Sequence, residues 1–174
     1  YNEVRTSLLY NTESVYSNNE IIGGNITEKA LLSYIGSSNK NKKVLEYFPF
    51  NSENKFSYVL LDNNITYIKG AREVLLSKCD YYLDELGNKK LLRKKLIIDD
   101  FINKSTKLGN RVIAFAYSNS EFKSLTLIGF VLIKDEIREE AIEAIKLVKS
   151  ASIQTVMVTG DNKQTAVAIA KEVG

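Results

Sequence analysis

Histidine is absent from this 174-residue chain, and cysteine occurs once, at Cys79. Without histidine, the usual zinc sites, histidine-based catalytic triads and histidine general bases are excluded within the chain. A single cysteine excludes an internal disulfide bond and a zinc site built on cysteines. The rest of the composition, with 44% hydrophobic and 26% charged residues, is ordinary for a globular domain.

Long apolar runs and a strong charge imbalance are also lacking. No apolar run approaches the ~20 residues that span a bilayer, so we expect this chain not to insert into a membrane. The net charge of +3 is too small to indicate a nucleic-acid partner, and we expect none. The densest basic run, residues 89–95, lies among leucines and predicts the solvated face of an amphipathic helix.

The order of the expected elements divides the chain into two parts. Residues 1–128 predict an α+β domain, in which an antiparallel sheet has flanking helices. Residues 129–174 predict strand, helix, strand and helix, which is typical of a parallel α/β sheet. Two strands cannot complete such a sheet. We therefore expect the chain to be an excised piece of a longer protein, with only a fragment of the second domain.

Apolar periodicity and turn residues predict the individual elements. The clearest is a hairpin, because Asp-Asn-Asn separates two apolar runs, and Asp and Asn tolerate turn conformations. Leu8 and Leu9 are the main apolar anchor of the polar first 25 residues. The expected strands are 56–61, 65–68, 111–117, 125–133 and 153–158, and the expected helical segments are 29–35, 72–77, 90–107, 137–150 and 163–173.

The chain ends in a polar corner between an apolar run and a helix. Thr159, Gly160 and Asp161 follow Val158 directly, and the helix is expected from about Lys163. A helix N-terminus attracts anions and a carboxylate can hold Mg²⁺, so the corner suits phosphate chemistry. Most corners of this kind are structural, and the corner alone does not decide between the two interpretations.

Two segments near the expected hairpin carry residues that suit a base and a phosphate. Phe50 and Lys55 precede a strand, where an aromatic face and a lysine could hold such a ligand. Lys69 precedes Gly70, where the missing side chain would let a ligand approach the backbone. The plainer alternatives are a surface aromatic with a surface lysine, and a simple strand-to-helix turn.

Arg111 and Glu28 are two further candidates. Arg111 begins an expected strand, as an anion ligand or as a surface charge. Glu28 follows Asn25 by three residues, which is the spacing of a helix-capping carboxylate. The chain contains no Gly-x-x-x-x-Gly-Lys-Ser/Thr, so a P-loop nucleotide site is excluded within it.

Six short motifs resemble, in their order along the chain, those of the P-type cation-transporting ATPases. The likeness is strongest to the calcium and sodium/potassium pump group and covers about residue 20 to the end. Each motif is weak alone, but six in this order and spacing are specific. They are Gly24–Leu31, Pro49–Ser52 with Asn54–Lys55, Lys69–Ala71, Arg111–Val112 with Ala114, Asp135–Arg138, and Thr159–Asp161 with Thr165–Ala166 and Ile169–Ala170.

The resemblance implies that residues 1–128 are a nucleotide-binding (N) domain. It implies that adenine stacks on Phe50, and that Lys69 lies at the inner end of the pocket with Gly70 giving the base room. It also implies that Glu28 lies near the adenine and Lys55 near the phosphates.

The resemblance further implies that residues 129–174 are part of a phosphorylation (P) domain with a haloacid-dehalogenase-like α/β fold. Thr159 and Asp161 would be its catalytic residues, contacting the transferred phosphate and helping to organise magnesium and nucleotide. The other nucleotide-site positions that it implies are Arg111, Asp135, Arg138 and Gly160.

The whole protein implied by the resemblance is an integral membrane ATPase, with this chain on the cytoplasmic side. It would use ATP and Mg²⁺, form an aspartyl phosphate and transport a cation, with calcium the first guess. Its partners would be adenine nucleotide and the rest of its own chain, namely the remaining P domain and the actuator and membrane domains. The chain contains no Asp-Lys-Thr-Gly-Thr, the segment that holds the phosphorylated aspartate, so we expect it to be inactive alone and its metal site to be incomplete.

Several residues depart from the family pattern. Arg72 replaces the proline that usually follows Lys-Gly-Ala, and Glu136 and Ile137 replace the prolines of the hinge motif. Two alternatives remain: a soluble haloacid-dehalogenase-like phosphatase, with residues 1–128 as its cap, and a nucleotide-free interaction domain. Phe50 and the Lys69-Gly70-Ala71 turn discriminate against the phosphatase, because a generic cap has no reason to carry them. The interaction domain predicts instead that Phe50→Ala leaves every ligand measurement unchanged.

Overall fold

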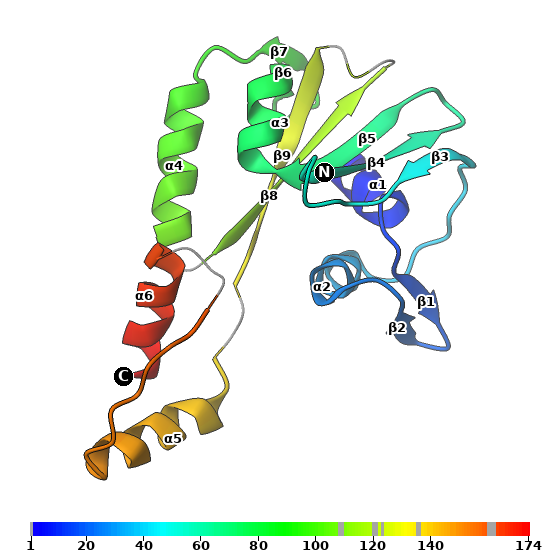
Figure 1. Cartoon of the computed structure of the whole chain (residues 1–174). Coiled ribbons are helices and arrows are strands. Elements are labelled where there is room, and N and C mark those ends of the chain that lie inside the picture. The colour runs from blue at the N-terminus through cyan, green and yellow to red at the C-terminus, as the bar shows by residue number, and fades with distance from the viewer. Residues whose placement is uncertain (1, 108–109, 120–121, 123, 135–136, 160–162) are drawn as a thin grey trace. The chain divides into compact units, whose positions relative to one another are not determined.

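The chain folds into mixed α and β structure in two compact units (Figure 1). The first unit is Tyr1–Lys95 with Ile113–Val131, and the second is Leu96–Val112 with Leu132–Gly174. The computed structural model describes residues 2–107, 110–119, 122, 124–134, 137–159 and 163–174. The predicted boundary between residues 128 and 129 remains a prediction.

The elements begin and end as follows. The helices are α1 (Asn2–Tyr10), α2 (Ile26–Ile35), α3 (Arg72–Lys78), α4 (Lys95–Lys107), α5 (Glu139–Ser150) and α6 (Lys163–Val173). The strands are β1 (Val15–Ser17), β2 (Glu20–Ile22), β3 (Val44–Phe48), β4 (Phe56–Leu61), β5 (Thr66–Ala71), β6 (Cys79–Leu83), β7 (Lys89–Leu91), β8 (Arg111–Ser118) and β9 (Leu125–Ile133).

Seven strands form one sheet in the order β3-β4-β5-β8-β9-β6-β7, and β1 and β2 form a separate ribbon. The prediction of an α+β fold with flanking helices is confirmed in this form. The sheet is not antiparallel throughout, because β6 pairs with β9 in parallel. A parallel pair needs a long crossover, and the chain supplies one through β7, α4 and β8.

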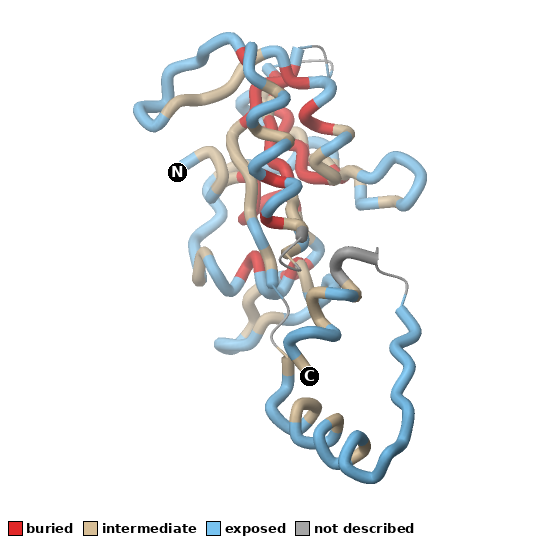
Figure 2. Tube along the Cα trace, turned by 90° about the vertical axis from the view of Figure 1, so that its left-hand side faces the viewer, coloured by how far each residue is buried: buried red, intermediate tan, exposed pale blue. Residues whose placement is uncertain are grey.

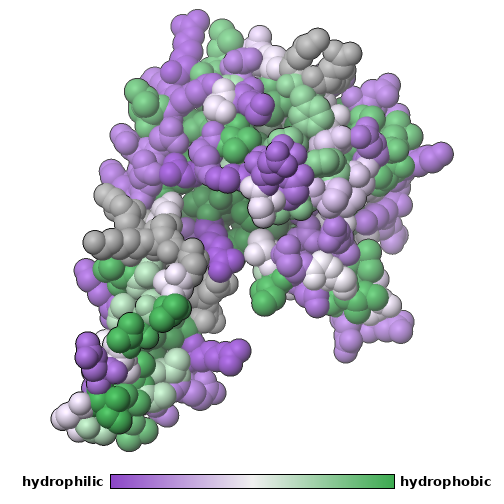
Figure 3. Space-filling model, in the orientation of Figure 1, coloured by the Kyte–Doolittle hydropathy of each residue, from purple (hydrophilic) through white to green (hydrophobic). Residues whose placement is uncertain are grey.

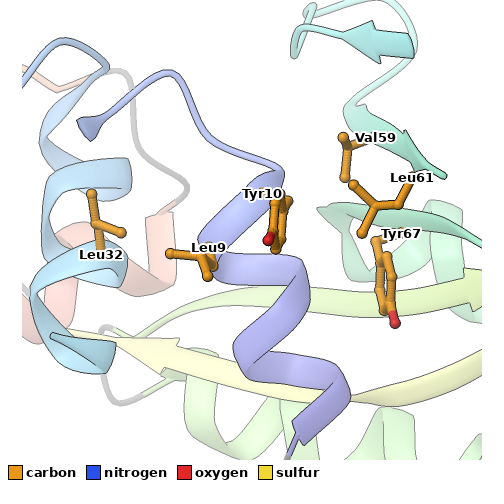
Figure 4. Close-up of a cluster of buried hydrophobic side chains, with 6 residues drawn as sticks. All are labelled: Leu9, Tyr10, Leu32, Val59, Leu61 and Tyr67. Carbon is orange, nitrogen blue, oxygen red and sulfur yellow. The ribbon is translucent and has the colours of Figure 1, made fainter. Parts of the chain in front are cut away.

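One face of the sheet is packed against α1 and α2. Along β4 the buried residues alternate with half-buried ones, as expected for a strand with one covered face. Buried residues, red in Figure 2, lie in α1, α2 and the central strands. Leu8 and Leu9 are both buried, which confirms them as the anchor of the N-terminal segment. Figure 4 shows the core cluster of Leu9, Tyr10, Leu32, Val59, Leu61 and Tyr67.

The predicted hairpin is confirmed as β4 and β5. Asn64 adopts φ 59° in the turn, and its N–H donates to the carbonyl of Leu61 at 3.0 Å. This left-handed conformation is one that asparagine tolerates better than most residues. The helix α3 then follows β5 without a break, as the sequence predicts.

The basic run 89–95 does not form a helix face, contrary to the prediction. Its first residues form β7, which pairs with β6, and α4 begins only at Lys95. The turn before it is fixed by Asp84, whose carboxylate accepts the N–H groups of Leu86 and Asn88 and lies 2.7 Å from Lys90 Nζ. These contacts hold the pKa of Asp84 down, to about 2. Such local hydrogen bonding favours a hairpin over a helix.

The predicted strand 153–158 is not formed, whereas the two predicted helices around it are present as α5 and α6. Val156 and Val158 are exposed, and hydrophobic side chains stand on the surface of the second unit (green, lower left in Figure 3). A parallel strand needs neighbours that satisfy its backbone, and no strand pairs with this segment in the described part of the chain. The described residues include no helix of the length and apolarity that a bilayer crossing requires.

Candidate functional site

A buried ion pair between Lys69 and Glu28 is the chemical centre of the first unit. Lys69 belongs to β5, and Glu28 lies in the first turn of α2. Lys69 Nζ lies 2.7 Å from Glu28 Oε1, and each side chain is 8% exposed. Burial lowers the pKa of Lys69, while the hydrogen bond and the charge of Glu28 act in the opposite direction. Each charge is therefore tolerated in the interior because the other one compensates it.

Glu28 joins three segments that are distant in sequence. Its Oε1 accepts from Lys69, and its Oε2 accepts the backbone N–H of Glu13 at 3.3 Å. The prediction of Glu28 as a capping carboxylate is wrong, because the cap of α2 is Asn25, whose Oδ1 accepts the Glu28 N–H at 3.0 Å. The carboxylate instead meets the buried ammonium, since an unpaired buried charge costs far more than an uncapped N–H.

Gly24 lies against this carboxylate. It has φ +59°, and a Cβ added there would lie 2.7 Å from Glu28 Oε2 and 2.2 Å from Ser14 Oγ. Both the conformation and the lack of space therefore require glycine. The position thus explains why the motif Gly24–Leu31 begins as it does.

Tyr47 lies within electrostatic range of the same carboxylates and was missed by the sequence analysis. It lies in β3 and is half-buried. Burial, together with the charges of Glu28 and Glu13, raises the pKa of Tyr47 to about 12. The phenol is therefore protonated at neutral pH and can donate a hydrogen bond.

Asn11 and Ser57 are buried polar residues next to the strand that carries Lys69, and both were also missed. Ser57 is the direct cross-strand partner of Lys69. Asn11 Nδ2 donates to the carbonyls of Ser57 at 3.1 Å and Tyr67 at 3.2 Å, and so holds β4 to β5. Ser57 Oγ and Asn11 Oδ1 are buried with no hydrogen-bond partner among the described residues. These two buried oxygen atoms could therefore still form hydrogen bonds.

Gly70 is required by the close approach of β4. A Cβ there would lie 2.5 Å from the Lys55 carbonyl oxygen and 2.7 Å from Phe56 Cα. Lys55 has φ 59°, and its carbonyl accepts the Ala71 N–H at 2.9 Å. The absence of a side chain at Gly70 thus allows the hydrogen bond that fixes the backbone of Lys55. A role of Gly70 in making space for a base remains a prediction.

Phe50 and Lys55 flank one tight turn. Asn51 accepts the Lys55 N–H with its carbonyl at 2.9 Å and the Asn54 N–H with its side chain at 2.7 Å. Phe50 is 55% exposed, so a face of its ring is accessible to a ligand. The Lys55 ammonium lies 3.9 Å from Glu73 in a loose pair, with side chains that are 55% and 61% exposed. An exposed pair of this kind is weak and leaves the lysine available to an anion.

The remaining predicted site residues lie in the second unit or outside the described residues. Arg111 is the first residue of β8, and Arg138 directly precedes α5. Thr159 ends the described segment before α6. The positions of these three relative to Lys69 remain predictions. Asp135, Gly160 and Asp161 lie outside the described residues.

The described residues include side chains of the types that an adenine nucleotide uses, but they include no ready site for Mg²⁺. Phe50 offers an exposed aromatic ring and Lys55 an exposed ammonium, and both belong to the same unit as the buried Lys69. In the part of the chain that the structure describes, no three acidic, cysteine or histidine side chains gather as metal ligands. Glu28, the carboxylate at the site, is already paired with Lys69.

Known proteins match most of this chain. The family model of the P-type ATPase cytoplasmic domain N matches residues 2–140. The calcium-transporting ATPase PAT1 of Dictyostelium discoideum is 36% identical over an alignment that covers 87% of this chain. The plasma membrane-type calcium-transporting ATPase 7 of rice is 37% identical over 95% of the chain. The chain spans only 15% and 19% of the lengths of these two relatives.

Proposed function

The chain belongs to the P-type cation-transporting ATPases, and we propose that it is the ATP-binding cytoplasmic portion of such a pump. The observation that carries the proposal is the buried Lys69–Glu28 pair, with Phe50 and Lys55 in the same compact unit. In the proposed complex, the adenine stacks on Phe50, Lys69 lies at the inner end of the pocket, and Lys55 meets the phosphates. Tyr47, whose phenol stays protonated, is a further hydrogen-bond donor in the same unit.

The whole protein would couple ATP hydrolysis to cation transport through an aspartyl phosphate, with Mg²⁺ as the metal. Calcium is the proposed cation, because the matched relatives are named calcium-transporting ATPases. Residues 129–174 would be part of a haloacid-dehalogenase-like P domain. There Thr159, Gly160 and Asp161 would face the transferred phosphate, with Arg111, Asp135 and Arg138 on the nucleotide side. A soluble phosphatase is not favoured, because the matched proteins are pumps.

The proposal is tested by titrating the chain with ATP, ADP and AMP, followed by NMR. We expect saturable binding that weakens by about 1–3 kcal/mol in Phe50→Ala, which is the usual worth of base stacking on an aromatic ring. Phe101→Ala is the matched control, because Phe101 is similarly exposed at 63% and lies in α4. Equal effects of the two substitutions, or no binding by the folded wild type, would contradict the proposal.

The same preparation should not turn over ATP. The chain lacks the Asp-Lys-Thr-Gly-Thr segment, so no aspartate is in place to accept the phosphoryl group. We expect phosphate release at the level of a mock-purified control. Steady release above that level would show that a nucleophile within these residues, or water, is activated without the family's aspartate.

The pH dependence of ATP binding should report on Lys69. Because burial lowers its pKa, Lys69 loses its proton at lower pH than an ordinary lysine, whose pKa is ~10.4. The charge of Lys69 at the inner end of the pocket, and its ion pair with Glu28, are therefore lost as the pH rises through the lowered value, and ATP affinity should fall with them. Lys69→Arg keeps its charge throughout this range, so its ATP affinity should fall less between neutral and alkaline pH. Identical profiles of the two proteins would exclude Lys69 as the titrating group.

A further inference from the structure

A pocket lies on the face of β4 and β5 opposite to Lys69. It is a groove of about 280 Å³ within the first unit, which we call the aromatic groove. It is lined by Phe48, Phe56, Tyr58, Ile68, Leu75, Lys78, Phe122 and Leu125. None of the residues assigned to the nucleotide lines it.

Strand alternation separates the groove from the Lys69 site. Ser57 and Lys69 are cross-strand partners on the face covered by α1 and α2. Tyr58 and Ile68 are the next pair, and their side chains therefore point to the other face. The groove side of β4 is only half-buried, so the sheet leaves an accessible apolar surface there.

The groove has aromatic walls in fixed orientations. Phe48 and Tyr58 stack with ring centroids 5.2 Å apart and an angle of 9° between their planes. Phe122 meets Tyr58 edge-on at 4.7 Å and 77°. The Tyr58 hydroxyl donates a hydrogen bond to Glu46 Oε1 at 2.6 Å, so the polar end of this ring already has a partner. The walls therefore present ring faces and edges, which suit a planar aromatic guest.

Lys78 gives the groove a charge preference. It is the last residue of α3 and the only charged side chain among the described residues that line the groove. A cation beside an apolar slot favours an apolar ligand that carries a negative charge. The same pocket chemistry, many apolar walls with a few polar groups, is common in small-molecule sites.

We propose that the aromatic groove binds a planar aromatic anion of about the size of a substituted indole or naphthalene. The volume is near the lower end of ligand pockets, ~300–1,000 Å³, so one bicyclic ring system with a short acidic group fits. A second copy of the chain is a poorer occupant, because stable protein interfaces bury ~1,200–2,000 Å². The site is separate from nucleotide binding and does not depend on the function proposed above.

The test compares two probes that share an aromatic body and differ in charge. The anionic probe is 2-naphthoate, and the neutral one is 2-naphthamide, both followed by their naphthalene fluorescence at saturating ATP and without it. We expect Lys78→Gln to weaken the anionic probe by about two- to fivefold, the worth of a solvent-exposed ion pair, and to leave the neutral probe unchanged. Tyr58→Ala should weaken both probes by about twofold to tenfold.

Controls make the result specific to the groove. Lys29→Gln removes an exposed lysine of α2 outside the groove and should change neither probe. Wild-type-like amide spectra of each variant show that the fold is retained. Displacement of the probes by ATP, equal effects of Lys78→Gln and Lys29→Gln, or probe binding that depends on chain concentration would overturn the proposal. Loss of ATP binding in Phe50→Ala, with probe binding intact, would separate the two sites.

Discussion

Glu28→Ala should destabilise the first unit by about 3–5 kcal/mol, because it leaves the Lys69 ammonium buried without its partner. The hydrogen bond to the Glu13 N–H is lost at the same time, which frees the segment between α1 and β1. Urea denaturation, followed through the NMR signals of the first unit, measures the change. This substitution should be the most destabilising of those considered, since a buried unpaired charge costs more than a lost surface contact.

Two comparisons distinguish the cost of an unpaired buried charge from the cost of losing the contacts of Glu28. The double variant Glu28→Leu with Lys69→Met removes both charges and should recover most of the lost stability, since apolar replacements of buried pairs are often neutral or better. The exposed pair Lys134–Glu172, at 2.9 Å with side chains 46% and 44% exposed, is the matched control. Glu172→Ala should cost at most about 1 kcal/mol, read from signals of the second unit. If Glu28→Ala costs as little as Glu172→Ala, the buried pair is not the centre of the site.

Gly24→Ala should produce the second largest effect, because it combines backbone strain with a collision at Glu28. The left-handed conformation alone costs about 1–2 kcal/mol for a residue with a Cβ. The added methyl group would also press on Glu28 Oε2 and Ser14 Oγ, which adds about 1–3 kcal/mol of overpacking. Because Glu28 holds Lys69, we expect ATP affinity to fall together with stability.

Gly87→Ala is the control that isolates the collision. Gly87 has φ +81°, but a Cβ there would meet nothing within 4 Å. It should show the cost of the conformation without the clash, and no change in ATP affinity. Adding Ser14→Ala to Gly24→Ala removes the nearest obstructing atom and should restore part of the loss. Equal costs at Gly24 and Gly87 would mean that Glu28 has room to move aside.

The sequence predicted those elements whose signals lie in a few neighbouring residues, such as turn and capping residues. The β4–β5 hairpin follows from the turn asparagines. The predicted helical segment 29–35 is present within α2, which begins earlier, at Ile26, because Asn25 caps it. The prediction of a strand at 153–158 was wrong because a strand of this kind depends on neighbouring strands and not on its own residues alone. Its apolar residues have β-forming character, but a parallel strand exists only with neighbours that this chain does not supply in its described part.

The site residues were predicted singly, but not their arrangement. Glu28 and Lys69 were both candidates, yet no periodicity joins residues of α2 and β5, so their pairing came only from the structure. Asn11 and Ser57 carry no motif, and their role depends on the register between β4 and β5. Tyr47 was missed because the strand β3 was missed. The effect of the Glu28 charge on the pKa of Tyr47 acts between segments that are distant in sequence, and sequence spacing does not encode it.

The path of the chain through the sheet has a kinetic consequence. Strands β3, β4 and β5 are consecutive and can pair soon after synthesis, but β5 is completed only by β8, where Thr66 pairs with Ser118. This pairing closes a long loop, which costs conformational entropy, so a nascent chain exposes the free edge of β5 until β8 has been synthesised. That edge carries the buried pair Tyr67 and Ile68, which are prone to aggregation while uncovered. Chains that end between β5 and β8 should therefore accumulate as aggregates, while the full chain passes through this stage only briefly.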